Sequence, residues 1–267
     1  MKNIILEFKK KKETNTPISV ITCYDYSFAK LFAQTEVDSI LVGDSMGNVI
    51  QGHGSTMPVT LDDIIYHTNA VCRGASNKTI IADMPFLSYQ TSVSDGIRAA
   101  GTIMKETKAD CVKLEGDSDL VIELTQRLNE IGVPVMSHLG LTPQSFNTLG
   151  GYKVQGKTPE SRARMIQKSK ELVDAGAFAV LFEMIPESLG KEITESISVP
   201  TIGIGAGRYT SGQVLVMQDL LGMNDEFHPK FLKKYANFAD DIKKAVGDYH
   251  DDVVKHLFPG EENGFKD

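Results

Sequence analysis

The chain contains no tryptophan, and only 7% of its 267 residues are aromatic. It also lacks an excess of positive charge, because 28 Lys and Arg residues stand against 35 Asp and Glu, for a formal net charge of −7. No basic stripe interleaved with aromatic residues is visible in the sequence. Nucleic acid and anionic membranes are therefore not expected as partners.

Long apolar runs are missing as well. The longest, Ala175 to Ile185, is interrupted by Glu183 and is too short to cross a bilayer. At the N-terminus, the stretch MKNIILEFKKKK places its lysines after the apolar residues, which are too few for a signal peptide. We therefore expect a cytoplasmic protein with no membrane-spanning segment.

Cysteine is scarce. Cys23, Cys72 and Cys111 are odd in number and widely spaced, and none belongs to a CxxC pair. Reduced thiols packed in the core are the expected state. Paired cysteines or histidines at the spacing typical of zinc sites are also absent from the sequence.

The sequence does contain a regular alternation of short apolar runs and helical stretches. A short helix is expected at residues 2–11 and a charged helical region at 229–257, with the last ten residues frayed. Eight strands are expected between them, at 19–23, 39–42, 79–82, 111–114, 133–137, 177–182, 200–203 and 214–217. Helices are expected through Phe28 and Phe32, and at 61–73 behind Thr60 as N-cap, 94–105, 119–130, 159–174 and 187–196. Loops are expected after the second strand and, rich in Thr, Pro, Gly and Gln, at 142–157.

This alternation predicts a parallel sheet, and near-continuous apolar strands indicate that helices cover it. Eight units in roughly 250 residues predict an α/β fold, a closed (β/α)8 TIM barrel whose active site lies at the C-terminal ends of the strands. We expect one domain over residues 1–267, with a doubly wound open sheet as the alternative. The glycines at 203, 205 and 207 follow G-x-G-x-G and do not make a dinucleotide-binding fingerprint.

Acidic or imidazole side chains follow seven of these eight strands. They are Asp25, Asp44, Asp83, Glu115, His138, Glu183 and Asp219. Asp25 and Asp219 are expected only to cap the helices that follow. For Asp44 considered alone, a capping role and a functional role have about equal weight. The others would converge on one mouth if the barrel closes.

Several carboxylates in one cleft repel each other, which raises their pKa values or requires a cation. Mg²⁺ suits such a site, because it takes one or two carboxylates together with waters and substrate oxygens. We therefore predict Asp44 and Asp83 as metal ligands, with Glu115 beside them, bound directly or through water.

Four further side chains are candidates for chemistry. Lys113 lies two residues from Glu115 on one strand, so both share a face, and a buried ammonium there would pair with a substrate carboxylate or with Glu115 itself. Glu183 stands among apolar residues that would raise its pKa toward that of a general base, unless it turns to solvent. His138 and His53 are second-tier candidates.

Several stretches resemble the ketopantoate hydroxymethyltransferase family. They are VGDSMGNVIQGHGSTMPVT, ADMPF, KLEG, HLGLTPQSFNTLGGYKVQG, GIGAG and, near the C-terminus, PKFLKKYANF and FPGEENGF. The resemblance spans nearly the whole chain and implies a (β/α)8 barrel that assembles as a homodecamer, a pentamer of dimers. It further implies one Mg²⁺ per subunit and hydroxymethyl transfer from 5,10-methylenetetrahydrofolate to 3-methyl-2-oxobutanoate, on the route to pantothenate.

The resemblance also implies roles for individual residues. Asp44, Asp83 and Glu115 would belong to the metal site, Asp44, Ser45, Asp83 and Lys113 would contact the ketoacid, and Glu183 would accept the proton. The chain departs from many relatives at Gly54, where they carry an acid. Two other functions remain open: a Mg²⁺-dependent carbon–carbon lyase of the pyruvate and phosphoenolpyruvate barrel type, and a ligand-binding barrel without catalysis.

Overall fold

A computed structural model describes residues 3–151 and 153–266 of the chain. The strands are β1 (Ile18–Thr22), β2 (Ser39–Val42), β3 (Thr79–Asp83), β4 (Cys111–Glu115), β5 (Val135–Gly140), β6 (Ala179–Glu183), β7 (Thr201–Ile204) and β8 (Gly212–Leu215). The helices are α1 (Ile4–Glu13), α2 (Tyr26–Phe32), α3 (Met46–Val49), α4 (Leu61–Gly74), α5 (Val93–Glu106), α6 (Asp119–Glu130), α7 (Phe146–Leu149), α8 (Pro159–Asp174), α9 (Glu187–Ser196), α10 (Met217–Leu220) and α11 (Phe238–Val254). Short 3-10 turns lie at Pro143–Ser145 and Glu261–Asn263.

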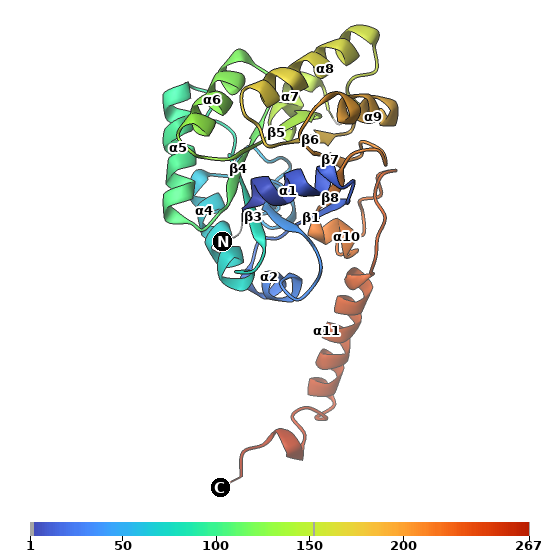
Figure 1. Cartoon of the computed structure of the whole chain (residues 1–267). Coiled ribbons are helices and arrows are strands. Elements are labelled where there is room, and N and C mark those ends of the chain that lie inside the picture. Colours follow the sequence, from blue (N-terminus) through green and yellow to red (C-terminus); the bar gives the residue numbers. More distant parts are fainter. Residues whose placement is uncertain (1–2, 152, 267) are drawn as a thin grey trace. The chain divides into compact units, whose positions relative to one another are not determined.

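The eight strands form one closed barrel in sequence order, and every neighbouring pair is parallel. Figure 1 shows the helices that follow the strands surrounding this barrel. The predicted (β/α)8 barrel is thus confirmed, and the open sheet is excluded because β8 pairs back onto β1. All the strand carboxyl ends therefore meet at one mouth.

Side chains that point into the barrel fill its interior and pack against residues at the end where the strands begin. Leu41, Ile81 and Met136 belong to one buried cluster, together with Ile4 and Phe8 on one face of α1. The ring of Phe8 meets that of Phe178, just before β6, edge-on at a centroid distance of 5.6 Å. Helix α1 therefore packs at the end where the strands begin, opposite the mouth (Figure 1).

Local sequence signals fix several helix starts. Thr60 caps α4 as predicted, since its side chain accepts from the backbone N–H of Asp63, and the Asp63 carboxylate accepts from that of Thr60. Asp25 has the expected capping role, because its carboxylate accepts from the Phe28 backbone N–H at 2.9 Å.

Most strand boundaries differ from the sequence prediction by one to three residues, and the differences in β5 and β8 affect the candidate site residues. Strand β5 runs on to Gly140, so His138 lies within it and opposite Glu115 on β4. Strand β8 ends at Leu215 because its register with β1 begins at Gly212, two residues before the predicted start. Asp219 therefore lies inside α10 and caps no following helix; its carboxylate accepts from the Asn224 side chain at 3.5 Å.

Three further segments differ. The residues after β2 form the short helix α3, where a loop was expected. The expected long loop at 142–157 contains a 3-10 turn and α7, while Tyr152 lies outside the described residues. The expected helix at 229–257 is confined to α11, and part of the last ten residues forms a 3-10 turn. The helix expected at 2–11 is α1, with Lys2 outside the described residues.

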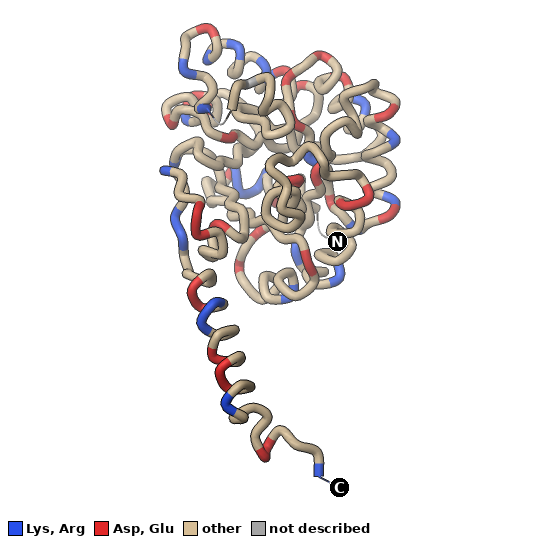
Figure 2. Tube along the Cα trace, turned by 180° about the vertical axis from the view of Figure 1, so that it is seen from behind, with Lys and Arg blue, Asp and Glu red and all other residues tan. Residues whose placement is uncertain are grey.

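The chain divides into two compact units, Met1–Val216 with the barrel and Met217–Asp267 with α10 and α11. In the second unit, acidic and basic residues alternate along α11, as Figure 2 shows. Two of its lysines pair with aspartates one turn away, Lys244 with Asp248 and Lys255 with Asp251. That residues 1–267 fold as one domain stays a prediction.

No helix within residues 3–151 and 153–266 is both long and apolar enough to span a bilayer. Cys23, Cys72 and Cys111 are all buried, in agreement with the packing role expected for them.

Candidate active site

Neighbouring strands deliver the predicted polar side chains to the barrel mouth in register. Asp83 stands opposite Lys113, Glu115 opposite His138, and Gly140 opposite Glu183. Parallel pairing makes strand ends neighbours in space, so residues far apart in the sequence meet there.

Lys113 lies at the centre of the cluster. Its ammonium nitrogen is 2.8 Å from Asp83 Oδ1, 3.2 Å from Glu115 Oε1 and 3.2 Å from His138 Nδ1. The residue is only 3% exposed. Burial lowers its pKa, but the carboxylates of Asp83 and Glu115 more than offset this and raise the pKa, so Lys113 stays charged. Of the two partners considered from the sequence, Glu115 does pair with Lys113, and Asp83 pairs with it as well; pairing with a substrate carboxylate stays a prediction.

Asp44 and Asp83 are adjacent and almost fully buried. The backbone N–H of Asp44 donates to Asp83 Oδ2 at 2.9 Å. Burial raises the pKa of Asp44 well above its usual range, and the charges of Glu115 and Asp83 add to this. Burial also raises the pKa of Asp83, which Lys113 offsets only in part.

The pKa of Glu115 shifts in the opposite direction to those of Asp44 and Asp83. Burial would raise its pKa, but Lys113 and His138 outweigh this and lower the pKa to about 2. The four carboxylates at the mouth, on Asp44, Asp83, Glu115 and Glu183, face the single ammonium of Lys113 among them. The cluster therefore attracts a further cation.

The donor set fits Mg²⁺ held by two carboxylates. Asp44 and Asp83 are buried and adjacent, and their pKa values are raised. A bound hard cation stabilises the ionised carboxylates and so offsets the cost of burying them. Within residues 3–151 and 153–266, no three His, Cys, Asp or Glu side chains are disposed to ligate one ion directly. Glu115, which pairs with Lys113 and His138, therefore suits a place beside the ion rather than on it.

Glu183 ends β6 at the rim of the cluster. Its side chain is 18% exposed, and Oε2 lies 3.5 Å from His138 Nε2. Burial and the charge of Glu115 raise its pKa to about 8. The next residue, Met184, has a φ of 47°, a strained conformation for a non-glycine residue that turns the chain sharply after the carboxylate.

His138 bridges these groups. Nδ1 is 3.1 Å from Glu115 Oε1 and 3.2 Å from Lys113 Nζ. Burial and the nearby Lys113 lower its pKa, which favours a neutral imidazole. Nδ1 can accept from the Lys113 ammonium or donate to the Glu115 carboxylate, depending on the ring tautomer, and Nε2 faces Glu183.

The remaining predicted residues, Ser45 and His53, both follow β2, but only Ser45 lies at the barrel mouth. Ser45 lies at the mouth, where its hydroxyl is 2.8 Å from that of the buried Tyr24. His53 is exposed and lies outside the buried cluster. A Cβ at Gly54 would meet no atom within 4 Å, so this position leaves room for a side chain.

Sequence reasoning missed the residue with most contacts to this cluster, Gln144. Its side-chain amide donates to Asp44 Oδ2 at 2.9 Å and to the carbonyl of Met84 at 3.0 Å. Its backbone N–H donates to Glu115 Oε2 at 3.2 Å. Gln144 is 6% exposed and enters from the segment after β5 that was expected to be a loop.

The buried Tyr89 was missed as well. Its hydroxyl lies 2.9 Å from Gln144 Oε1, and it accepts from the backbone N–H of Glu115 at 3.0 Å. The only sequence signal for these residues was the polar character of the stretch after β5, which does not indicate where its side chains point.

A model of the ketopantoate hydroxymethyltransferase family matches residues 2–261 of the chain. The 3-methyl-2-oxobutanoate hydroxymethyltransferase of Leptospira biflexa is 67% identical over all of both chains. The protein of that name from Leptospira interrogans is 54% identical, over 99% of this chain and 100% of its own. That of Enterococcus faecalis is 49% identical over 100% of this chain and 96% of its own.

Solved structures of other barrels are similar in fold. One of 2,3-dimethylmalate lyase covers 100% of this chain and 93% of its own, with a TM-score of 0.61 and 14% identity. One of phosphonopyruvate hydrolase, in complex with oxalate and Mg²⁺, covers 98% and 93%, with a TM-score of 0.59 and 10% identity. Identities this low show a shared fold alone.

Proposed function

Since the chain belongs to the ketopantoate hydroxymethyltransferase family, we propose that it transfers a hydroxymethyl group from 5,10-methylenetetrahydrofolate to 3-methyl-2-oxobutanoate, giving ketopantoate (2-dehydropantoate). The observation that carries this proposal is the buried cluster of Asp44, Asp83, Lys113 and Glu115 at the barrel mouth. A 2-oxo acid presents a carboxylate and a carbonyl side by side, which suit an ammonium and a cation held by carboxylates.

Mg²⁺ is the proposed cofactor, one per subunit, with Asp44 and Asp83 as its carboxylate ligands and Glu115 beside it. When bound, it would supply Lewis-acid polarisation of the ketoacid. The raised pKa values of both aspartates support this assignment, because a bound cation stabilises their ionised forms.

Lys113 and Ser45 are proposed to bind the ketoacid carboxylate. Lys113 is fixed by Asp83 and Glu115, so its ammonium is positioned before substrate arrives. Tyr24 holds the Ser45 hydroxyl at 2.8 Å, which orients it at the mouth. Positioned donors of this kind reduce the entropic cost of binding a small anion.

Glu183 is proposed to remove the C3 proton of the ketoacid. A carboxylate with a pKa near neutrality is matched to proton transfer at physiological pH. His138 Nε2, 3.5 Å away, can donate to the Glu183 carboxylate and hold it in place. The C3 carbon then attacks the methylene carbon of the co-substrate. The carbon–nitrogen bonds to the folate break, one water supplies the hydroxyl oxygen, and tetrahydrofolate leaves carrying the proton from C3 and one from the water. Residues 142–151 and 153–157 cover the mouth and limit the access of bulk water.

The assembly and location expected from the family are part of this proposal: a cytoplasmic homodecamer. Light scattering measures the assembly directly.

One assay tests the function. Purified protein, Mg²⁺ and 3-methyl-2-oxobutanoate are incubated with and without 5,10-methylenetetrahydrofolate, and ketopantoate is followed. The proposal requires product only with the folate. Carbon–carbon cleavage of 2-oxo acid derivatives without folate would instead support the Mg²⁺-dependent lyase.

A further inference from the structure

Tyr89 lies in the segment between β3 and α5, and its side chain is fully buried. Its hydroxyl accepts from the backbone N–H of Glu115 at 3.0 Å. The same hydroxyl lies 3.0 Å from the backbone carbonyl of Glu115 and 2.9 Å from Gln144 Oε1. A tyrosine hydroxyl has one proton, so it can donate to only one of these two oxygens at a time. These bonds connect Tyr89 to the carboxylates of the mouth through Glu115 and Gln144.

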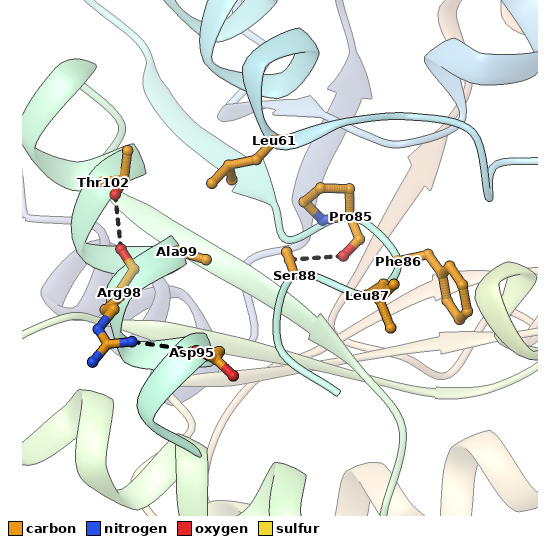
Figure 3. Close-up of a pocket in the computed structure, with 9 residues that line it drawn as sticks. All are labelled: Leu61, Pro85, Phe86, Leu87, Ser88, Asp95, Arg98, Ala99 and Thr102. Atoms are coloured by element: carbon orange, nitrogen blue, oxygen red, sulfur yellow. Dashed lines mark hydrogen bonds and ion pairs between the residues drawn. The ribbon is translucent and has the colours of Figure 1, made fainter. Parts of the chain in front are cut away.

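The turn that precedes Tyr89 fixes its place. The carbonyl of Pro85 accepts from the Ser88 backbone N–H at 3.1 Å and from the Ser88 hydroxyl at 2.7 Å, the bond drawn in Figure 3. Leu87, between them, has a φ of 66°, a conformation that non-glycine residues rarely adopt. The chain therefore turns sharply after β3, so that Leu87 is exposed while Tyr89 is buried.

The two ends of the Gln144 side-chain amide have different surroundings. The oxygen, Oε1, accepts from Gln90 Nε2 at 2.8 Å and lies 2.9 Å from the Tyr89 hydroxyl. The nitrogen, Nε2, donates to Asp44 Oδ2 at 2.9 Å and to the Met84 carbonyl at 3.0 Å. With the amide reversed, its oxygen would face two acceptors and its nitrogen would face the Gln90 nitrogen, so these bonds would be lost. Tyr89 and Gln90 therefore favour the orientation in which the nitrogen faces Asp44.

This orientation matters because the Asp44 carboxylate is buried beside another carboxylate. Asp44 is 3% exposed, and its backbone N–H already donates to Asp83 Oδ2. The Gln144 donor at Oδ2 stabilises the charge of Asp44 and fixes the direction of its carboxylate. Groups that orient a metal ligand in this way typically change metal affinity by about 10- to 100-fold when they are removed.

We propose that Tyr89 and Gln90 are positioning residues for the metal site, because together they hold the Gln144 amide with its nitrogen on Asp44. In this arrangement the Tyr89 hydroxyl accepts from the backbone N–H of Glu115 and donates to Gln144 Oε1. The inference rests on the proposed function, in which Asp44 is a ligand of Mg²⁺. The segment after β3 thus orders a carboxylate at the end of β2 through a residue of the segment after β5.

Calorimetric titration of the metal-free protein with Mg²⁺, in the absence of substrate, tests this chain of bonds. Tyr89→Phe and Gln90→Leu should each weaken Mg²⁺ binding by about 2- to 10-fold, the usual range for one neutral hydrogen bond. Gln144→Leu, which removes the donor to Asp44 itself, should weaken it by about 10- to 100-fold. Thr125→Val is the control: it removes another buried hydroxyl, on α6 outside the cluster, and should bind Mg²⁺ as the wild type does.

Double variants separate positioning from general support of the fold. If Tyr89 and Gln90 act through the Gln144 amide, adding either substitution to Gln144→Leu should weaken Mg²⁺ binding no further. A structural role, for example through the backbone of Glu115, predicts instead that the two losses multiply. Multiplied losses, or wild-type Mg²⁺ affinity in either single variant, would overturn the proposal. Gln90 is only half-buried, so Gln90→Leu carries the same comparison if Tyr89→Phe does not fold.

The metal assignment on which this inference rests is checked separately by Asp44→Asn. Mg²⁺ binding that is lost in Asp44→Asn but unchanged in the Tyr89 and Gln90 variants would refute the positioning role alone. Mg²⁺ binding that Asp44→Asn leaves unchanged would refute the proposed metal site and, with it, the positioning role.

Discussion

The side-chain nitrogen of Gln144 lies 2.9 Å from Asp44 Oδ2, although the two residues are 100 positions apart in the chain. The backbone nitrogen of the same glutamine lies 3.2 Å from Glu115 Oε2. One residue of the segment after β5 thus holds two of the carboxylates that we assign to the metal site. The position of this segment and the order of the site are therefore linked through Gln144.

Gln144→Leu tests this coupling. Loss of the amide leaves Asp44 Oδ2 without that donor in a buried site, which costs about 1–3 kcal/mol at a charged acceptor. Mg²⁺ affinity or kcat should fall about 10- to 100-fold, as measured by steady-state kinetics over a range of Mg²⁺ concentrations. Gln126→Leu, on the exposed face of α6, is the control, and equal Mg²⁺ dependence in the two variants would remove Gln144 from the site.

Lys113 and Asp44 should have opposite effects on the stability of the metal-free protein. Lys113→Met leaves Asp83 and Glu115 buried without their shared cation, and breaking such a pair typically costs about 3–5 kcal/mol. Asp44→Asn instead removes a charge that burial and its neighbours already disfavour, and should raise the free energy of unfolding. Urea denaturation in EDTA measures both; destabilisation by Asp44→Asn would contradict the electrostatic description of the cluster.

Metal binding should appear as thermal stabilisation that depends on the two aspartates. At a Mg²⁺ concentration of about 100 times its Kd, the folded state gains about 2.7 kcal/mol. Asp44→Asn and Asp83→Asn should lose this gain and all Mg²⁺-dependent activity, with the fold intact by circular dichroism. Asp95→Asn changes a half-exposed aspartate of α5 outside the cluster and should keep both. Turnover by the wild type after exhaustive chelation would exclude the metal assignment.

The raised pKa of Glu183 predicts a pH dependence of stability with a definite sign. Between the ordinary carboxyl pKa and about 8, the folded state keeps a proton on Glu183 that the unfolded state has lost. The free energy of unfolding should therefore fall as pH rises through this window, by at most about 1.4 kcal/mol per pH unit. Urea denaturation of metal-free wild type and Glu183→Gln isolates this contribution. The stability of Glu183→Gln relative to the wild type should increase with pH across this window; a difference that does not change with pH would show that Glu183 titrates normally.

Much of the scaffold was predictable because it depends on local patterns. Apolar runs marked the strands, and N-cap residues such as Thr60 marked helix starts, so α6, α8 and α9 match the prediction at both ends. The acids at strand ends were predictable for the same reason, since a closed barrel brings strand ends together whatever their distance in sequence.

Other features depend on contacts that no local pattern contains. The limits of β8 follow from its register with β1, which moved Asp219 off a strand end and into α10. Gln144 acquires its role from the turn at Pro143, which directs its side chain toward Asp44. His53 is the opposite case. Its position between two glycines suggested a functional residue, but in the structure its side chain is exposed.

The central claim is that Glu183 removes the C3 proton of the bound ketoacid, and solvent exchange tests it most directly. Wild-type protein with Mg²⁺ and 3-methyl-2-oxobutanoate, without folate, should incorporate deuterium at C3, followed by NMR. Glu183→Gln keeps the shape and hydrogen bonding of the side chain but cannot accept the proton. It should bind the ketoacid, because Lys113 and the aspartates are unchanged, and lose exchange by about 10²–10⁴-fold. Exchange by Glu183→Gln at the wild-type rate would contradict the claim and make His138 the next candidate.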